Sequence, residues 1–159
     1  CNRCSAQRRA AVDRARVPAP ATPLRVLRMT TTATPLRVLV VDDDEFASTV
    51  VCAILQKFKA VPTCAADGES AVNRWNEQQD DQRLDVVLLD WELGSMSGLD
   101  VLKHIQQRKN LSPAARVIML SGNDPSDNDR NTFLEAGAAD FWVKPVSARQ
   151  IESLTKQVR

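Results

Sequence analysis

The sequence contains no long apolar run, and its hydrophobic stretches stay well short of the roughly 20 residues that a membrane-spanning helix requires. Its first residues also lack an apolar core followed by a cleavage site, which argues against a secretory signal. Hydrophobic residues make up 43% and charged residues 26% of the chain, the composition of an ordinary globular domain. We therefore expect one cytoplasmic domain with no membrane partner.

The sequence has four cysteines and one histidine, and we expect neither a metal site nor a redox site from them. Cys1 and Cys4 form a C-x-x-C pair, but no second pair follows at the spacing that a four-ligand zinc site needs. Cys52 falls in a predicted helix and Cys64 in a short predicted strand, and we interpret both as buried thiols. The single histidine, His104, falls on the solvent side of a helical pattern, so we interpret it as a surface residue.

Positive charge is concentrated in the first 35 residues. Seven arginines and one aspartate give this segment a formal charge of +6, whereas fourteen basic and nineteen acidic residues give the remainder −5. We interpret residues 1–35 as a disordered basic leader, with Met29 as a candidate translation start. A basic arm that contacts nucleic acid or a membrane is the alternative. Residues 36–159 form the predicted domain, whose acidic balance argues against direct nucleic-acid binding.

From residue 36 the hydrophobic pattern alternates between strands and helices. Apolar or β-branched runs predict strands at 37–41, 62–66, 85–89, 116–120 and 141–143. Helical spacing predicts helices over 45–59, over 69–79, around 101–105, around 133–134, and after Ser147. In the first helix, the four-residue spacing predicts one apolar stripe of Phe46, Val50, Ile54 and Phe58. Five strands alternating with five helices predict a doubly wound α/β fold with a parallel sheet.

Polar side chains follow four of the five predicted strands. These are Asp42, Asp43 and Asp44 after the first strand, Asp90 after the third, Ser121 after the fourth and Lys144 after the fifth. The carboxyl ends of parallel strands meet at one edge of a sheet, where ligands bind. Carboxylates about 5 Å apart repel by about 3 kcal/mol at an effective dielectric of about 20. Mg²⁺ would remove that repulsion, and a lysine beside it would neutralise a phosphoryl group.

An N-cap role is the simpler interpretation of these acids, since Asp43 or Asp44 also suits the start of the first helix. Capping explains one strand end well, but it does not explain polar residues at four strand ends together. The pattern therefore predicts a site for a divalent cation and a phosphoryl group.

Four segments resemble the receiver domain of response regulators, the CheY-like family, and follow its order and spacing: Val38–Asp44, Asp85–Asp90, Val117–Gly122 and Gly137–Pro145. The resemblance covers residues 36–159 and implies a flavodoxin-like sheet with strand order 2-1-3-4-5. It implies a signalling module of a two-component system, and not an enzyme. Such a module takes a phosphoryl group from a histidine kinase or histidine phosphotransfer protein and then binds a downstream output protein or domain. A monomer or a weak phosphorylation-dependent dimer is expected.

The same resemblance implies how the acidic residues divide their roles. Asp90 would be the phosphorylated nucleophile. Asp43 would bind Mg²⁺ directly, and Asp42 would help to hold the ion through water. The backbone carbonyl of Glu92, two residues past the nucleophile, would be the third protein ligand.

The remaining strand-end residues would bind the phosphoryl group and respond to it. Lys144 would pair with its oxygens, and Pro145 stands at the family's usual cis-proline position. Ser121 would be the switch hydroxyl that moves to bond the phosphate, and Phe141 would be the aromatic switch residue that rotates inward with it.

Two alternatives from other functional classes remain open. A degenerate receiver would serve only as a docking surface, without phosphorylation. An aspartyl phosphohydrolase would use Glu92 as its second acid, but that class carries its nucleophile on the first strand and has a cap domain or long insertions. Whether the chain is a stand-alone regulator, our first choice, or a piece of a larger regulator or hybrid kinase is also open.

Overall fold

The computed structural model describes residues 34–79, 83–107 and 115–158. Strands and helices alternate through this part of the chain, as the sequence predicts. The strands are β1 (Arg37–Val41), β2 (Val61–Ala65), β3 (Val86–Asp90), β4 (Arg116–Ser121) and β5 (Asp140–Val143). The helices are α1 (Glu45–Lys57), α2 (Gly68–Asn76), α3 (Gly98–Gln107), α4 (Asp127–Glu135) and α5 (Ala148–Val158). Residues 1–33 of the predicted leader, with Cys1 and Cys4, lie outside the described residues, so the division at residue 36 stays a prediction.

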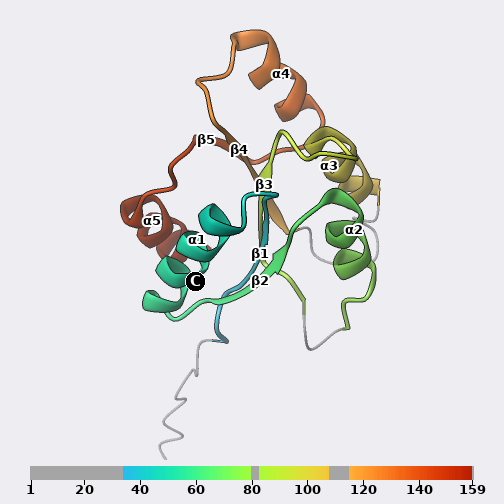
Figure 1. The fold of residues 1–159 in the computed structure, drawn as a ribbon. Helices are drawn as coiled ribbons and strands as arrows, with labels where there is room; N and C mark the ends of the chain where they lie inside the picture. Colours follow the sequence, from blue (N-terminus) through green and yellow to red (C-terminus); the bar gives the residue numbers. More distant parts are fainter. Residues whose placement is uncertain (1–33, 80–82, 108–114, 159) are drawn as a thin grey trace, which may run out of the picture. The chain divides into compact units, whose positions relative to one another are not determined.

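The five strands form one parallel sheet in the order β2-β1-β3-β4-β5, which is the order that the family resemblance implies. Figure 1 shows α1 and α5 on one face of this sheet and α2 and α3 on the other. Both faces of the central strands are therefore covered, which explains why these strands are continuous apolar runs. The predicted doubly wound fold is confirmed.

Alternate residues of the central strands supply two separate hydrophobic cores. In β1, Val38 and Val40 face the core beneath α1 and α5, whereas Leu39 and Val41 face the core beneath α2 and α3. All four side chains are fully buried. Because successive side chains of a strand point to opposite faces, one apolar run stabilises both layers of helices. The strand ends are consequently held in fixed positions along one edge.

The buried face of α1 differs from the apolar stripe that the four-residue spacing predicts. Ser48, Val51 and Leu55 are its buried residues, whereas Phe46 is 78% exposed and Val50 is also exposed. Apolar residues occupy more than one side of this helix, and packing on the sheet selects the side that carries Val51 and Leu55. The predicted stripe is therefore wrong at Phe46 and Val50.

The edge strand β2 is less buried than the sequence suggests. β2 pairs with β1 alone, and Cys64 on it is exposed, while Cys52 on α1 is half-buried. The prediction that both are buried thiols is wrong, and for Cys64 the reason is that an edge strand has a neighbour on one side only.

Candidate functional site

Two acidic side chains are buried where β1 and β3 end side by side. Asp42 follows β1 and is 2% exposed, and Asp90 is the last residue of β3 and is 5% exposed. Buried charges of one sign are costly unless a positive group lies near them. The surroundings of this pair therefore decide what the site can do.

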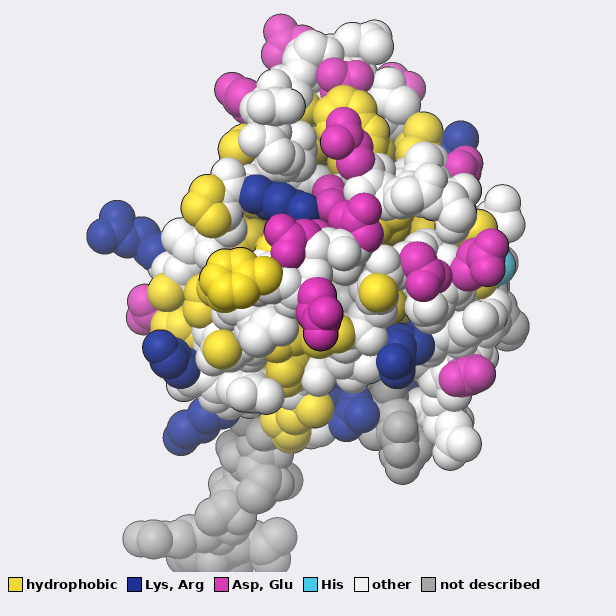
Figure 2. All heavy atoms as spheres, in the orientation of Figure 1, with side chains coloured by type: hydrophobic (Ala, Val, Ile, Leu, Met, Phe, Trp, Pro, Cys, Tyr) yellow, Lys and Arg dark blue, Asp and Glu magenta, His cyan; other side chains and the backbone are white. Residues whose placement is uncertain are grey.

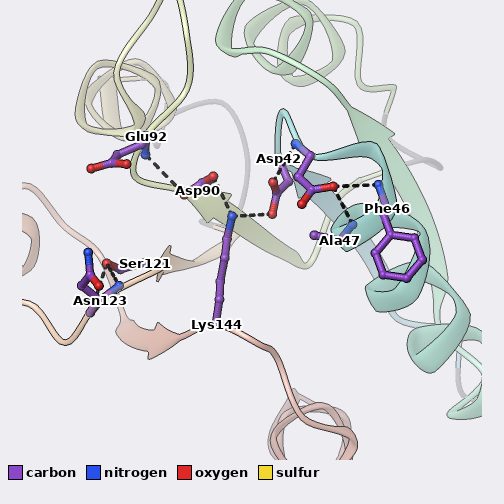
Figure 3. A network of polar contacts seen from close by, with 9 residues as sticks. Asp42, Phe46, Ala47, Asp90, Glu92, Ser121, Asn123 and Lys144 are labelled. Atoms are coloured by element: carbon purple, nitrogen blue, oxygen red, sulfur yellow. Dashed lines mark hydrogen bonds and ion pairs between the residues drawn. The ribbon is translucent and has the colours of Figure 1, made fainter.

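Lys144 supplies the positive charge from the end of β5. Its Nζ lies 2.7 Å from Oδ2 of Asp42 and 2.7 Å from Oδ2 of Asp90, so one ammonium bridges both carboxylates (Figure 3). The lysine side chain is 23% exposed and the Lys144–Pro145 peptide is cis, as the resemblance implies. The strand order brings together residues that are far apart in the sequence, in the way that the strand-end pattern predicts.

Burial and charge shift the proton equilibria of this group. Burial raises the pKa of Asp90 above its ordinary value, and the nearby Asp42 carboxylate adds to the rise, although the bond from Lys144 opposes it. For Lys144, burial favours the neutral amine, but hydrogen bonds to Asp42 and Asp90 outweigh it and raise the pKa. Lys144 is therefore a cation at neutral pH, placed to stabilise negative charge on Asp90 or on a group attached to it.

Asp43 joins these two aspartates in an acidic cluster. Carboxylate oxygens of Asp42, Asp43 and Asp90 lie within 4.8 Å of one another, and Asp43 is exposed to solvent. Asp44 is not part of this cluster, because its Oδ1 accepts hydrogen bonds from the backbone N–H groups of Phe46 (2.9 Å) and Ala47 (3.1 Å) and caps α1. A set of carboxylate oxygens at this spacing suits a hard cation such as Mg²⁺.

An open hollow of about 480 Å³ lies beside the acidic cluster. Its lining residues are Asp43, Trp91, Glu92, Leu93, Gly94 and Ser97. The backbone N–H of Glu92 donates a hydrogen bond to Oδ1 of Asp90 at 3.3 Å. The backbone of the loop after β3 therefore contacts the aspartate side chain. The role of the Glu92 carbonyl as a metal ligand stays a prediction. The hollow is open to solvent, so a small molecule or an ion can reach the acidic cluster from it.

Gly98, at the start of α3, holds this loop close to the strand end. A Cβ on Gly98 would lie 2.2 Å from the backbone oxygen of Asp90 and 3.0 Å from Cα of Trp91. The N–H of Gly98 also donates to the carbonyl of Trp91 at 2.9 Å. Sequence reasoning missed this residue, although a glycine at the start of a helical pattern is a signal for such a close approach of two backbones.

Ser121, the last residue of β4, is turned toward its own loop. Its hydroxyl donates to the carbonyl of Asn123 at 2.7 Å and accepts from the N–H of Asn123 at 3.2 Å (Figure 3). The side chain is buried, at 5% exposure. In this arrangement the hydroxyl hydrogen is used within the loop, and a group on Asp90 would have to compete for it.

Phe141 belongs to a group of three aromatic rings beside the site. Its ring centroid lies 6.3 Å from that of Trp91 and 5.6 Å from that of Phe133, and the guanidinium of Arg130 lies 5.8 Å from its centroid. Trp91 follows Asp90 directly, so the ring group begins one residue from the acidic cluster. Sequence reasoning missed this group, because its members come from three elements and share no periodic signal.

Comparison with known proteins identifies the family of this domain. The model of the response regulator receiver domain family matches residues 38–156. The chain belongs to this family. As a receiver domain of the two-component type, it is a signalling module. Figure 2 shows one face of the receiver domain, where acidic side chains gather around a basic one and hydrophobic side chains are exposed beside them.

A curated relative of this receiver domain is the phosphate regulon transcriptional regulatory protein PhoB of Escherichia coli (strain K12). It is 35% identical over 120 residues, which cover 76% of this chain and 50% of PhoB. The chain thus spans about half the length of this relative. The expectation of no nucleic-acid partner applies to this chain alone, since PhoB as a whole is a transcriptional regulator.

Solved receiver domains have the same fold. A CheY-like receiver domain protein from Methanospirillum hungatei JF-1 is 25% identical, with a TM-score of 0.67 over 79% of this chain and 94% of that chain. The receiver domain of the sensor histidine kinase PA1611 from Pseudomonas aeruginosa PAO1, with a magnesium ion coordinated in its active-site cleft, is also 25% identical. Its TM-score is 0.64, over 78% of this chain and 97% of that chain.

The length and composition of the helices show whether any of them could span a membrane. Among the residues that the structure describes, no helix is both long enough and apolar enough to span a bilayer.

Proposed function

We propose that this receiver domain accepts a phosphoryl group on Asp90 in a Mg²⁺-dependent reaction and thereby changes a surface that binds a partner. One observation carries the proposal: Lys144 joins the buried carboxylates of Asp42 and Asp90 through contacts of 2.7 Å, with Asp43 beside them. This arrangement supports the proposal, because a nucleophile, its neutralising cation and ligands for a divalent ion would all have to lie within one small region.

The chemistry of phosphoryl transfer suits these residue types. Transfer to an aspartate depends on alignment and on neutralising charge more than on covalent assistance. Asp90 supplies the attacking oxygen, and Lys144 neutralises the transferred group as a point charge. Mg²⁺, when bound by Asp42, Asp43, Asp90 and the Glu92 carbonyl, would reduce the negative charge of the donor phosphate. The magnesium described in the PA1611 receiver domain supports this assignment.

Ser121 and Phe141 would carry the response to phosphorylation. A phosphoryl group adds close to two negative charges and three strong acceptor oxygens. The Ser121 hydroxyl would leave the carbonyl of Asn123 and donate to one of these oxygens instead. Phe141 would then rotate inward and leave its contacts with Trp91 and Arg130. The surface formed by β4, α4 and β5 would change as a result.

The partners follow from this role. The phosphoryl group would come from a histidine kinase or a histidine phosphotransfer protein, and the changed surface would bind an output protein or domain. The match covers half of PhoB, which is a transcriptional regulator. An output in transcriptional control is therefore consistent with the proposal. The cytoplasm, where phosphodonors are found, is the proposed location.

The test is to incubate the protein with Mg²⁺ and acetyl phosphate and to measure its intact mass and tryptophan fluorescence. We expect one added phosphoryl group, which requires Mg²⁺ and is absent in Asp90→Asn. Asp85→Asn is the matched control, because Asp85 lies beside the opposite end of β3 and accepts a bond from the N–H of Arg37 at 2.8 Å, which asparagine can retain. This control should be phosphorylated like the wild type.

The alternative outcomes are distinct. A protein that binds Mg²⁺ but takes up no phosphoryl group would be a docking module, and the proposal would fail. Continuous release of phosphate from many substrates, with turnover that Glu92→Gln abolishes, would instead support the phosphohydrolase interpretation.

A further inference from the structure

Two cysteines from different elements meet on the face of the sheet that carries α1. Cys52 on α1 and Cys64 on β2 have their Sγ atoms 2.6 Å apart, and both are free thiols. They are 12 residues apart in the sequence. The two sulfurs are therefore in direct contact, at a distance somewhat longer than the roughly 2.05 Å of a disulfide bond.

The fold holds this contact in place from both sides. Cys64 is paired in register with Val40, a fully buried residue of β1. On the helix, Cys52 is next to Val51, which is buried against the sheet together with Leu55. Neither sulfur lies on a chain end or a long loop. The packing of α1 on the sheet sets their approach.

The two thiols differ in their access to solvent. Cys64 is exposed, so a dissolved oxidant reaches it, whereas Cys52 is half-buried. Burial, together with the contact with Cys64, raises the pKa of Cys52 to about 12. Cys52 is therefore protonated at neutral pH and a poor first nucleophile, since the thiolate is the reactive form. This asymmetry suits a pair in which one thiol reacts first and the other completes the bond.

We propose that Cys52 and Cys64 form a reversible redox modification site that closes to an intramolecular disulfide when it meets a small-molecule disulfide such as oxidised glutathione. In the first step the Cys64 thiolate attacks one sulfur of oxidised glutathione, and one glutathione leaves as the thiolate. In the second step Cys52 loses its proton to solvent and attacks the Cys64 sulfur, which releases the second glutathione. The protein loses two electrons and two protons, and the oxidant is reduced to two thiols.

The bond would fasten α1 to the edge strand close to the acidic cluster. Cys64 precedes Ala65, whose carbonyl accepts the N–H of Asp42 at 3.2 Å, and α1 begins at the cap formed by Asp44. Closing a loop of this length restricts the unfolded chain and so favours the folded one. In a reducing compartment the pair stays open, and it closes under oxidative conditions, as is typical of redox-sensing thiols.

The experiment uses the full chain, incubated in buffers with rising ratios of oxidised to reduced glutathione. Remaining thiols are then alkylated and the chain is cut with trypsin, which cleaves after Lys57 and Lys59, between the two cysteines. The disulfide appears as a linked pair of peptides, residues 38–57 joined to residues 60–74. We expect this pair to form in monomeric protein, to disappear with dithiothreitol, and to form faster in the folded chain than in urea.

Variants separate this pair from the other cysteines. Cys64→Ser and Cys52→Ala should each abolish the linked peptides, whereas Cys4→Ser should leave them unchanged. Oxidation should raise the melting temperature of the wild type by about 5–10 °C, as expected for a loop of this size in a domain of this length. Cys52→Ala should show no such rise.

Three results would overturn the proposal. The first is a folded protein that gives no linked peptides at any glutathione ratio. The second is a reaction that stops at a glutathione adduct on Cys64, and the third is a bond between two chains through Cys64. None of these readouts depends on phosphorylation of Asp90.

Discussion

Nζ of Lys144 lies 2.7 Å from Oδ2 of Asp90, so the carboxylate that we propose as phosphoryl acceptor is already paired with a cation. The same nitrogen contacts Asp42 at an equal distance. Lys144 therefore performs in the resting domain part of the neutralisation that a divalent ion would provide. Lys144 and a divalent ion would therefore compete for the same two carboxylates, and the site should be sensitive to the loss of the lysine.

Replacing Lys144 by methionine should make the protein depend on Mg²⁺ for stability. Without the ion, the free energy of unfolding at neutral pH should fall by about 1–3 kcal/mol, because two buried carboxylates lose a charged partner. Added Mg²⁺ should then raise the melting temperature more than it does in the wild type, and calorimetry measures both effects. Lys156→Met, which removes an exposed lysine paired with Glu152, is the control and should behave like the wild type. Equal Mg²⁺ responses in the two variants would contradict the competition.

Adding a methyl group at Gly98 should destabilise the loop that follows β3. Gly98→Ala would place a Cβ 2.2 Å from the backbone oxygen of Asp90, so the strand end or the start of α3 must move. We expect a loss of about 1–3 kcal/mol in the free energy of unfolding, measured with urea. Gly94→Ala is the matched control in the same loop, because its Cβ would have no atom within 4 Å. That variant should stay within about 0.5 kcal/mol of the wild type.

The charge of Asp67 should stabilise the domain only above acidic pH. Asp67 caps α2 by accepting the N–H of Ser70 at 2.7 Å and its hydroxyl at 2.9 Å, and these bonds lower the pKa of Asp67. A lowered pKa in the folded state means that the stabilisation is present above the ordinary value of about 3.9 and is lost as the pH falls through the folded value.

The Asp67→Asn variant isolates this effect, since asparagine retains the capping oxygen but not the charge. Its melting temperature should lie below that of the wild type at pH 7, and the gap should narrow as the pH falls below 4. A gap that is constant from pH 7 to pH 2 would mean that the charge contributes nothing.

Truncation of two apolar residues of α1 should change the stability of the domain by very different amounts. Leu55→Ala removes a fully buried side chain and should cost about 2–5 kcal/mol in the free energy of unfolding. Phe46→Ala removes a side chain that is 78% exposed and should change this free energy by less than about 0.5 kcal/mol. Urea denaturation of both variants tests the observed buried face of α1 against the stripe that the sequence predicts.

Much of the fold follows from the sequence because strand runs and polar strand ends are local signals. The apolar run before Asp42 and the run before Asp90 each indicate a strand covered on both faces, and a parallel sheet then places their ends together. The convergence of these two aspartates with Lys144 is therefore predictable, and the structure confirms it. The roles in metal binding, phosphorylation and switching stay predictions.

Other features depend on tertiary packing, which the sequence does not display. Phe46 and Val50 lie on an apolar stripe, but whether a stripe is buried depends on which side of α1 meets the sheet. Cys64 is exposed because β2 is an edge strand, and strand order is not a local property. Trp91 follows β3 and Phe141 lies on β5, with β4 between these strands, and their rings meet although they are 50 positions apart.

The strand order has a consequence for how this domain can diverge. The central strand β3 carries Asp90, the proposed ion ligands Asp42 and Asp43 follow the neighbour on one side, and Ser121 and Phe141 belong to strands on the other. Adjacent strands are about 4.8 Å apart, so the proposed ion ligands and the proposed switch residues lie within one or two strands of the proposed acceptor. Under the proposed function, substitutions near Ser121 and Phe141 would alter the partner surface while leaving the proposed ion ligands unchanged. Lys144 follows β5, on the same side as Phe141, but its side chain contacts Asp42 on the other side. It is therefore a position where the two sides must change together.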